Sequence, residues 1–259
     1  MKDLPLEGRV ALVTGVSRRI GIGFAVADRL ASMGADLFVH SFVLFDEGNP
    51  WGADRAGIGP LLEELRAHGR RVEHIDADFA DPEAPRRVME AAVQAYGHVD
   101  ILVANHAYYG SGNGSLEDLT AQDIDKTMQV NVRGSLLLVK EFAAQHDGRP
   151  GGRVVLFTSG QHLGPMPGEL AYIASKGALH QLTASLSAHL IPRGITVNTV
   201  NPGGTDTGWA TGDLYDAIRA RHPQGRWGQP EDAARLVAWL ATDDACWITG
   251  QVINSTGGG

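Results

Sequence analysis

The chain has 259 residues, of which 43% are hydrophobic and 20% charged, and its formal net charge is −8. This is the composition of an ordinary globular protein, and α/β sheets of this length fold as one unit, so we expect a single domain over residues 1–259. The negative charge and the absence of a lysine or arginine run argue against a nucleic-acid or anionic-membrane surface. Both kinds of surface require a concentrated positive field.

The sequence carries no recognisable targeting, membrane or metal-binding signal. No apolar stretch of signal length follows its start, and nowhere do about 18 consecutive apolar residues occur, so we expect a cytoplasmic protein with no membrane contact. Cys246 is the only cysteine, and the ten histidines show no metal-ligand spacing. An intrachain disulfide and a cysteine-based metal cluster are therefore excluded, and we predict no metal site.

Short apolar runs alternate with longer segments of helical periodicity along the chain. The runs are continuously apolar, which is typical of strands buried on both faces of a parallel sheet. The predicted strands are 10–13, 37–39, 101–103, 154–157 and 196–200. The predicted helices are 24–33, 59–68, 85–96, 120–145 and 171–190, and a further one begins near Pro230. This alternation requires crossover connections and predicts a parallel sheet between two layers of helices.

Two longer loops interrupt the alternation. Residues 46–57 are polar and glycine-rich and follow the second predicted strand, so we predict an inserted loop there. Residues 203–229 mix glycine, threonine and aspartate with two tryptophans. Because binding residues often lie on loops carried by a rigid scaffold, we interpret 203–229 as a substrate loop or lid.

The first predicted strand leads into a glycine-rich loop and then directly into a helix. The loop reads Thr14-Gly15-Val16-Ser17-Arg18-Arg19-Ile20-Gly21-Ile22-Gly23. A pyrophosphate needs bare backbone N–H groups beside a helix N-terminus, and glycine permits that close approach. The alternative interpretation is an ordinary tight turn between a strand and a helix. In this context the glycines predict a dinucleotide cofactor.

The surroundings of the loop favour NADP over NAD. An NAD-specific site usually places an acid near the end of the second strand, and residues 40–42 contain none. Arg18 and Arg19 could pair instead with a 2′-phosphate, because guanidinium groups match phosphate oxygens. Asp46 and Glu47 lie in the inserted loop, and either arginine could point to solvent, so NAD stays the alternative.

A serine, a tyrosine and a lysine form a second candidate group. Ser159 ends the fourth predicted strand, and Tyr172 and Lys176 lie one turn apart on one face of a predicted helix. A free phenol has a pKa of about 10, and a neighbouring ammonium would lower it. Alone, the pair would more often be a surface tyrosine and a solvated lysine. With the glycine loop, and with Asn131 on an earlier helix, the group indicates catalysis of proton transfer.

These segments together resemble the classical short-chain dehydrogenase/reductase family, and the likeness covers essentially the whole chain. The resemblance implies an α/β protein with a doubly wound parallel sheet, the Rossmann fold. It also implies a homotetramer, with interfaces on helices 120–145 and 171–190 and near strand 251–254. Segments 228–232 and 248–251 resemble the family's C-terminal signatures.

The resemblance assigns a role to each member of a catalytic tetrad. Tyr172 would be the general acid in reduction, and Lys176 would tune it and hold the nicotinamide ribose. Ser159 would orient the carbonyl, and Asn131 would keep a water in a proton relay. The hydride would come from the nicotinamide cofactor.

The expected cofactor residues come from the glycine loop and from three further segments. Asp78 resembles the family's adenine-binding acid, and residues 202–207 resemble its nicotinamide-side loop. The full set is Gly15, Ser17, Arg18, Arg19, Gly21, Ile22, Gly23, Ser41, Asp78, Phe79, Asn105, Tyr172, Lys176, Pro202, Gly203, Thr205 and Thr207.

The chain departs from the family pattern at two places. The usual T-G-x-x-x-G-x-G loop is two residues shorter than this one if Gly21 and Gly23 are its last glycines; alternatively, Arg19 replaces a glycine. We prefer the longer loop, because residues 21–27 fit the family's helix opening. Where the family commonly has N-N-A-G, residues 104–107 read A-N-H-A, so His106 could contact substrate or merely fill space.

A wall of aromatic and hydrogen-bonding side chains is expected around the substrate. Its predicted members are His106, Tyr108, Tyr109, His162, Met166, Glu169 and Trp209. This mixture suits a small polar or ring-bearing carbonyl compound, which would be reduced with NADPH to a secondary alcohol.

Two other functions stay open on the sequence. A 3-oxoacyl-acyl-carrier-protein reductase has a similar pattern, but its acidic carrier needs basic docking residues, and these are sparse in 145–147 and 188–193. A nucleotide-binding regulator could have kept the fold and lost catalysis, since a fold alone does not fix a function. The complete tetrad argues against that regulator.

Overall fold

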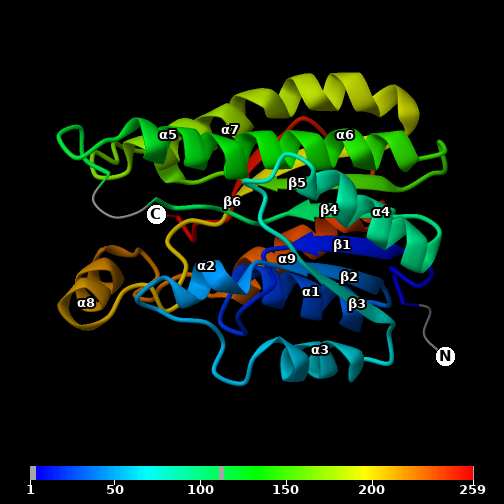
Figure 1. The fold of residues 1–259 in the computed structure, drawn as a ribbon, viewed down its shortest axis with the longest axis horizontal. Coiled ribbons are helices and arrows are strands. Elements are labelled where there is room, and N and C mark those ends of the chain that lie inside the picture. The colour runs from blue at the N-terminus through cyan, green and yellow to red at the C-terminus, as the bar shows by residue number, and fades with distance from the viewer. Residues whose placement is uncertain (1–3, 111–113, 259) are drawn as a thin grey trace.

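A seven-stranded parallel sheet forms the centre of the molecule (Figure 1). The computed structural model describes residues 4–110 and 114–258. The sheet contains β1 (Val10–Thr14), β2 (Asp36–Ser41), β3 (Val72–Asp76), β4 (Ile101–Ala104), β5 (Gly152–Phe157), β6 (Ile195–Asn201) and β7 (Val252–Asn254). Its order is β3-β2-β1-β4-β5-β6-β7, with every neighbouring pair parallel. The predicted doubly wound sheet is confirmed.

Helices cover both faces of the sheet (Figure 1). One layer holds α1 (Ile22–Ser32), α3 (Ile58–Arg66) and α9 (Pro230–Ala241). The other holds α4 (Ala84–Tyr96), α5 (Ala121–Thr127), α6 (Ser135–Gln145) and α7 (Leu170–Leu190). All helices predicted from the sequence are present.

Alternate residues of the central strands pack into two separate apolar cores. In β1, Ala11 and Val13 belong to the core under α1 and α9, and Val10 and Leu12 to the core under α4 and α6. All five residues of β1 are buried. A strand covered on both faces cannot alternate apolar and polar residues, which explains the continuous apolar runs in the sequence.

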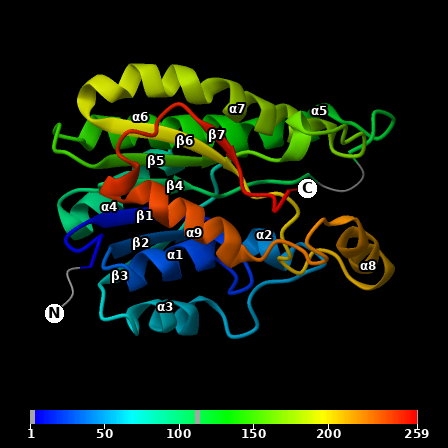
Figure 2. The same cartoon turned by 180° about the vertical axis from the view of Figure 1, so that it is seen from behind.

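The sequence analysis did not find the edge strand β3 or two short helices, whereas β7 is the strand that the family resemblance implied near residues 251–254. β3 and β7 each lie at an edge of the sheet, and both contain partly exposed polar residues. The short helices are α2 (Val43–Glu47), which leads into the predicted inserted loop, and α8 (Gly212–Arg221), which lies inside the 203–229 segment. Figure 2 shows α8 at the end of the molecule away from the N-terminus.

The predicted helix 120–145 is interrupted by a π-helical segment. Residues Met128–Gly134 form this segment, η1, between α5 and α6. A π-turn inserts an extra residue into the helical path and is frequent at functional sites. Here it carries Asn131, whose side chain is fully buried.

The described part of the chain gives no sign of a membrane span or a metal centre. None of its helices is both long and apolar enough to cross a bilayer. No group of three or more His, Cys, Asp or Glu side chains within residues 4–110 and 114–258 is arranged to hold a metal ion.

Candidate active site

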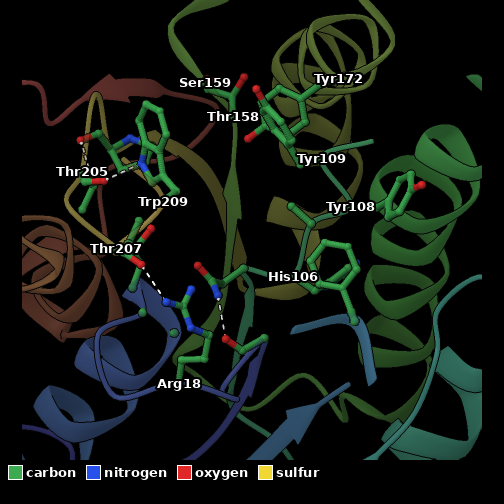
Figure 3. Close-up of a pocket in the computed structure, with 18 of the residues that line it drawn as sticks. Arg18, His106, Tyr108, Tyr109, Thr158, Ser159, Tyr172, Thr205, Thr207 and Trp209 are labelled. Carbon is green, nitrogen blue, oxygen red and sulfur yellow. Dashed lines mark hydrogen bonds between the residues drawn. The ribbon is translucent and has the colours of Figure 1, made fainter. Parts of the chain in front are cut away.

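A cavity of about 1020 Å³ opens where several parallel strands end (Figure 3). Residues that follow β1, β4, β5 and β6 line it, together with side chains of α2, α7 and α8. In a doubly wound sheet this crevice lies at the switch point between the two halves, here β1 and β4, where such folds bind ligands.

Most of the predicted site residues line this one cavity. From the cofactor set these are Gly15, Ser17, Arg18, Gly21, Ile22, Gly23, Asp78, Phe79, Asn105, Tyr172, Pro202, Gly203, Thr205 and Thr207, and from the others Ser159, His106, Tyr108, Tyr109, Met166, Glu169 and Trp209. The predicted residues that do not line it are Arg19, Ser41, Asn131, His162 and Lys176.

The glycine loop is packed so closely that side chains would not fit. A Cβ on Gly23 would lie 2.2 Å from the Gly15 carbonyl oxygen, and one on Gly15 would lie 2.8 Å from the Asn105 amide nitrogen. Gly15 also has a positive φ of 74°. Gly21 is the N-cap of α1, so the first turn of that helix faces the cavity with unhindered backbone N–H groups. This geometry fits the longer loop and an anion-binding helix N-terminus.

Two side chains that directly follow β4 connect the glycine loop to the sheet. The Asn105 amide donates to the carbonyl oxygens of Thr14 and Gly15, at 3.0 and 3.2 Å. His106 Nδ1 lies 2.8 Å from the Thr14 hydroxyl, and its Nε2 lies 3.2 Å from the Val130 carbonyl oxygen. Burial lowers the pKa of His106 well below its usual range, so the ring is neutral. Both of its nitrogens are engaged by the protein.

His40 supports the same loop from β2, and the sequence analysis did not assign it a role. Its Nδ1 accepts a 3.4 Å hydrogen bond from the Gly15 N–H, and its Nε2 donates to the Ala77 carbonyl oxygen at 2.8 Å. The ring stacks on Phe79 with 4.2 Å between centroids. Burial lowers the pKa of His40 to about 4. The sequence analysis noted only that residues 40–42 contain no acid. In the structure, the neutral His40 lies near the end of β2 and supports the glycine loop.

The two loop arginines point to different places. Arg18 lines the cavity, and its Nη2 donates a 2.9 Å hydrogen bond to the Thr207 carbonyl oxygen (Figure 3). Arg19 turns away and forms ion pairs with Asp54 at 2.6 Å and with Glu64 at 2.7 Å. The interactions of Arg19 therefore hold the inserted loop, whereas Arg18 connects the glycine loop to the segment after β6.

The segment after β2 closes one end of the cavity. The Ser17 hydroxyl donates to the buried Asp46 carboxylate, and Trp51 Nε1 donates to the same group at 3.1 Å. Asp46 and Trp51 also line the cavity. The Ser41 hydroxyl, in contrast, bonds to the side chains of His74 and Asp76 at 2.8 and 2.9 Å.

The predicted proton-transfer group assembles at the opposite end. The hydroxyls of Ser159 and Tyr172 point toward one another (Figure 3). Lys176 Nζ lies 5.6 Å from the centre of the Tyr172 ring and donates a 3.1 Å hydrogen bond to the Phe157 carbonyl oxygen. Lys176 is 2% exposed, so it lies beneath the cavity wall formed by Tyr172.

The surroundings favour the neutral forms of both groups. Desolvation raises the pKa of Tyr172, and the nearby Glu169 and Tyr109 raise it further, whereas the Ser159 hydroxyl lowers it. Burial lowers the pKa of Lys176 to about 8. We expected the ammonium to depress the phenol pKa, but desolvation outweighs this effect here. A protonated phenol is the state that donates a proton to a carbonyl oxygen.

Asn131 acts on the backbone beside the cavity. Its Oδ1 accepts a 2.6 Å hydrogen bond from the Tyr108 N–H, and its Nδ2 donates to the Tyr108 carbonyl oxygen at 2.9 Å. The same Nδ2 lies 2.9 Å from the Ser175 hydroxyl, which in turn donates to the Tyr172 carbonyl oxygen. Asn131 thereby joins η1 to α7 and fixes the chain just before Tyr109.

Aromatic side chains surround the space next to Tyr172. The rings of Tyr109 and Tyr172 lie 5.4 Å apart, and Trp209 faces the cavity from the segment after β6 (Figure 3). His162, which we expected in this wall, lies outside the cavity lining. Its Nε2 lies 3.0 Å from Asn254 Oδ1, and its ring packs against His180.

The 203–229 segment is anchored over the cavity by a cluster of aromatic rings. Trp227 is buried, stacks on Tyr215 of α8 with 5.1 Å between centroids, and meets Trp209 edge to face at 5.3 Å. Leu214 and Ile218 of α8 line the cavity. The sequence predicted that this segment is a substrate loop or lid. It did not predict which residues of α8 would line the cavity. Leu163 and His222 are further lining residues that the sequence analysis missed.

Comparison with known proteins identifies the family of the chain. A family model described as enoyl-(acyl carrier protein) reductase matches residues 15–259. The crystal structure of a short-chain dehydrogenase from Burkholderia cenocepacia J2315 in complex with NADP is 39% identical, with a TM-score of 0.86 and 98% of each chain covered. The chain belongs to the short-chain dehydrogenase/reductase family.

Two further relatives align with this chain over almost their whole length. Uncharacterized oxidoreductase YjdA from Bacillus subtilis (strain 168) is 41% identical over 254 residues, or 97% of each chain. The NADPH-dependent aldehyde reductase-like protein, chloroplastic, from Arabidopsis thaliana is 35% identical over 98% of this chain and 95% of that protein. This short-chain dehydrogenase/reductase is therefore an oxidoreductase, and it has the Rossmann fold that binds nicotinamide cofactors.

Proposed function

We propose that this protein uses NADPH to reduce the carbonyl group of a small, ring-bearing substrate to a secondary alcohol. The observation that carries the proposal is the meeting of Ser159 and Tyr172, with Lys176 beneath them, in the same cavity as the glycine loop. The reverse oxidation would use the same groups, because catalysis speeds both directions.

The cavity has the features that a dinucleotide requires. The bare loop and the N-terminus of α1 suit a pyrophosphate, and Asp78 and Phe79 offer an adenine site further along the same cavity. Lys176 lies beneath the wall where the nicotinamide ribose would rest. When bound, the nicotinamide would supply the hydride.

The protein would contribute orientation and one proton. The Ser159 hydroxyl donates a hydrogen bond to the substrate carbonyl oxygen, and the Tyr172 phenol gives its proton to that same oxygen. Lys176 holds a positive charge below Tyr172, which favours loss of the phenol proton during the reaction. Asn131 keeps η1 and the start of α7 in register, so that the phenol stays aligned. The raised pKa of Tyr172 supports reduction, because the phenol is protonated before the reaction.

Three observations support NADPH over NADH. Arg18 lies in the cavity with a guanidinium available to an anion, and β2 ends with the neutral His40 followed by Ser41, without an acid. The Burkholderia relative is a complex with NADP, and the Arabidopsis relative is named for NADPH. Asp46 opposes this preference, because its carboxylate lies at the same end of the cavity.

A carrier-bound 3-oxoacyl substrate is the second candidate. The description of the matching family model, which names an acyl-carrier-protein enzyme, favours it. Efficient turnover of an acetoacetyl carrier thioester, with weaker turnover of free cyclic ketones, would establish this alternative. The opposite ranking supports the proposal.

A homotetramer is also proposed on the family resemblance. Large apolar side chains that a monomer leaves in solvent support it: Trp247, before β7, is 94% exposed, and Trp239 of α9 is 41% exposed. Light scattering of the purified protein gives the mass that tests this assembly.

The decisive test compares the wild type with Tyr172→Phe. NADPH consumption is followed against cyclic ketones, sugars, keto-cyclitols and β-keto thioesters, and NADPH binding is followed by fluorescence. Removing the phenol proton should lower kcat about 10³-fold or more and leave the NADPH Kd within about threefold. Full activity in Tyr172→Phe would refute the mechanism, and NADPH binding without turnover of any carbonyl compound would favour a regulator.

A further inference from the structure

Glu169 is an acid at the substrate end of the cavity whose side chain the mechanism does not use. It immediately precedes α7 and stands one turn before Tyr172. Its backbone position is fixed, because its N–H donates to the Met166 carbonyl oxygen at 3.2 Å and its own carbonyl oxygen accepts from the Ile173 N–H at 2.8 Å. Neither bond involves the carboxylate.

The Glu169 carboxylate has no donor within the described residues. The cavity is lined by three acids, and the other two are engaged: Asp46 accepts from Ser17 and Trp51, and Asp78 accepts from the Ala80 N–H at 2.8 Å. Glu169 has neither a hydrogen bond nor an ion pair to its side chain in residues 4–110 and 114–258. It is nevertheless only partly exposed, and burial raises its pKa.

Two phenols lie near enough to Glu169 to feel its charge. That charge raises the pKa of Tyr109 and of Tyr172, and both rings line the cavity together with Met166 and Leu163. A carboxylate that is partly removed from water and has no hydrogen-bond donor raises the free energy of the folded protein. A ligand that donates a hydrogen bond to it offsets that free energy and binds more tightly. Aromatic walls beside an acid suit a ring that carries a hydroxyl or an ammonium.

We propose that Glu169 is a specificity-determining residue that accepts a hydrogen bond from a donor group, a hydroxyl or an ammonium, on the carbonyl substrate. The inference rests on the proposed function and narrows its substrate class. The preferred substrate is a cyclic ketone with a donor at a distance from the carbonyl, so that Tyr172 meets the carbonyl oxygen and Glu169 meets the donor.

The test uses two series of ketones, and the members of each series share one skeleton. Cyclohexanone, its 3- and 4-hydroxy derivatives and its 3- and 4-amino derivatives are compared with 2-tetralone and hydroxylated 2-tetralones, each with NADPH. Wild-type kcat/KM should be about tenfold or more higher for the best donor-bearing ketone than for its parent, as expected for a hydrogen bond to a charged acceptor.

Two variants at position 169 separate the two kinds of donor. Glu169→Gln keeps an acceptor oxygen but removes the charge, whereas Glu169→Leu removes both. A hydroxyl-bearing substrate should lose about threefold in Glu169→Gln and about tenfold or more in Glu169→Leu. An ammonium-bearing substrate should lose about tenfold or more in both variants. Each loss is expressed as the ratio of the donor-bearing ketone to its parent ketone in the same variant, so that a general effect of the substitution on Tyr172 cancels.

The control is Glu117→Gln, which removes the same charge from an exposed residue outside the cavity lining. It should leave every ratio between donor-bearing and parent ketones as in the wild type. A wild type without a donor preference, or a preference that survives in Glu169→Leu, overturns the inference while leaving the proposed reduction standing. If the wild type reduces none of these ketones, that result would instead count against the proposed function.

Discussion

Lys176 Nζ lies 5.6 Å from the centre of the Tyr172 ring, and the two residues have opposite pKa shifts. Burial lowers the pKa of the ammonium to about 8, and desolvation raises the pKa of the phenol. Each shift favours the neutral form of its group, because the surrounding protein solvates charge poorly. The protein therefore holds the Lys176 cation at a cost in stability, and this cost can be measured.

Replacing Lys176 by Met should stabilise the folded protein at neutral pH. The unfolded lysine keeps its proton up to its ordinary pKa of about 10.4, but the folded one loses it above about 8. Below pH 8 the wild type therefore carries a penalty for the buried charge. After allowance for the lost 3.1 Å hydrogen bond to Phe157, we expect Lys176→Met to raise the free energy of unfolding by about 2 kcal/mol at pH 7.

The pH dependence gives this prediction its sign. Between pH 8 and about 10.4 the unfolded state binds more protons than the folded state at this position, so wild-type stability gains from rising pH. Lys176→Met lacks that gain, and its advantage should shrink across the same window. Urea unfolding at several pH values, with Lys140→Met on the exposed face of α6 as the control, measures it. A variant less stable than the wild type at pH 7 contradicts the argument.

Glu169 should set the pH dependence of alcohol oxidation through its charge on Tyr172. Oxidation requires the phenolate, so its rate rises as pH passes the pKa of Tyr172. The ionisable groups around this phenol are Glu169 and Tyr109, which raise that pKa, and Lys176. Removing the negative charge in Glu169→Gln lowers the pKa, and the alkaline rise in kcat/KM should begin at lower pH. Glu117→Gln should leave the profile unchanged, and an unchanged profile in Glu169→Gln refutes the coupling.

The sequence sufficed for the sheet because its central strands are buried on both faces. Continuous apolar runs such as 10–13, with turn residues after them, are typical of such strands, and the glycine loop and the Tyr172 pair follow at the expected places. The edge strand β3 was missed because only one of its five residues is fully buried. The π-helical segment around Asn131 was missed because it continues directly from α5 into α6, and an inserted residue in a helical turn leaves no mark in the residue types.

Whether a single side chain reaches the cavity depends on contacts with residues that are distant in the sequence, and a short motif does not contain them. Arg18 and Arg19 are adjacent and chemically identical, yet only Arg18 lines the cavity, because Asp54 and Glu64 bind the other. His162 follows Ser159 closely in sequence but bonds to Asn254, which is 92 residues away along the chain. Long-range partners of this kind decide which residues of a motif reach a site.

The close approach of Gly23 to Gly15 predicts a sharp penalty for a single methyl group. In Gly23→Ala the new Cβ would overlap the Gly15 carbonyl oxygen, a backbone atom that cannot move without shifting the loop. We expect the NADPH Kd to rise about tenfold or more and the free energy of unfolding to fall by about 1–3 kcal/mol. Gly59→Ala in α3 is the control, because nothing lies within 4 Å of the new Cβ. Alanine there should stabilise the helix by about 1 kcal/mol, and equal effects of the two changes would contradict the packing argument.

Arg18 and Arg19 provide a matched pair for testing cofactor preference. The Arg18 guanidinium faces the cavity, so Arg18→Ala should remove a charged contact to the additional phosphate of NADPH. We expect kcat/KM with NADPH to fall about tenfold or more and with NADH by less than about threefold. Arg19→Ala removes the same charge from the ion pairs with Asp54 and Glu64, and it should change both cofactors equally. If Arg18→Ala instead weakens NADPH and NADH alike, Arg18 serves the pyrophosphate or the bond to Thr207, and the NADPH preference must come from another residue.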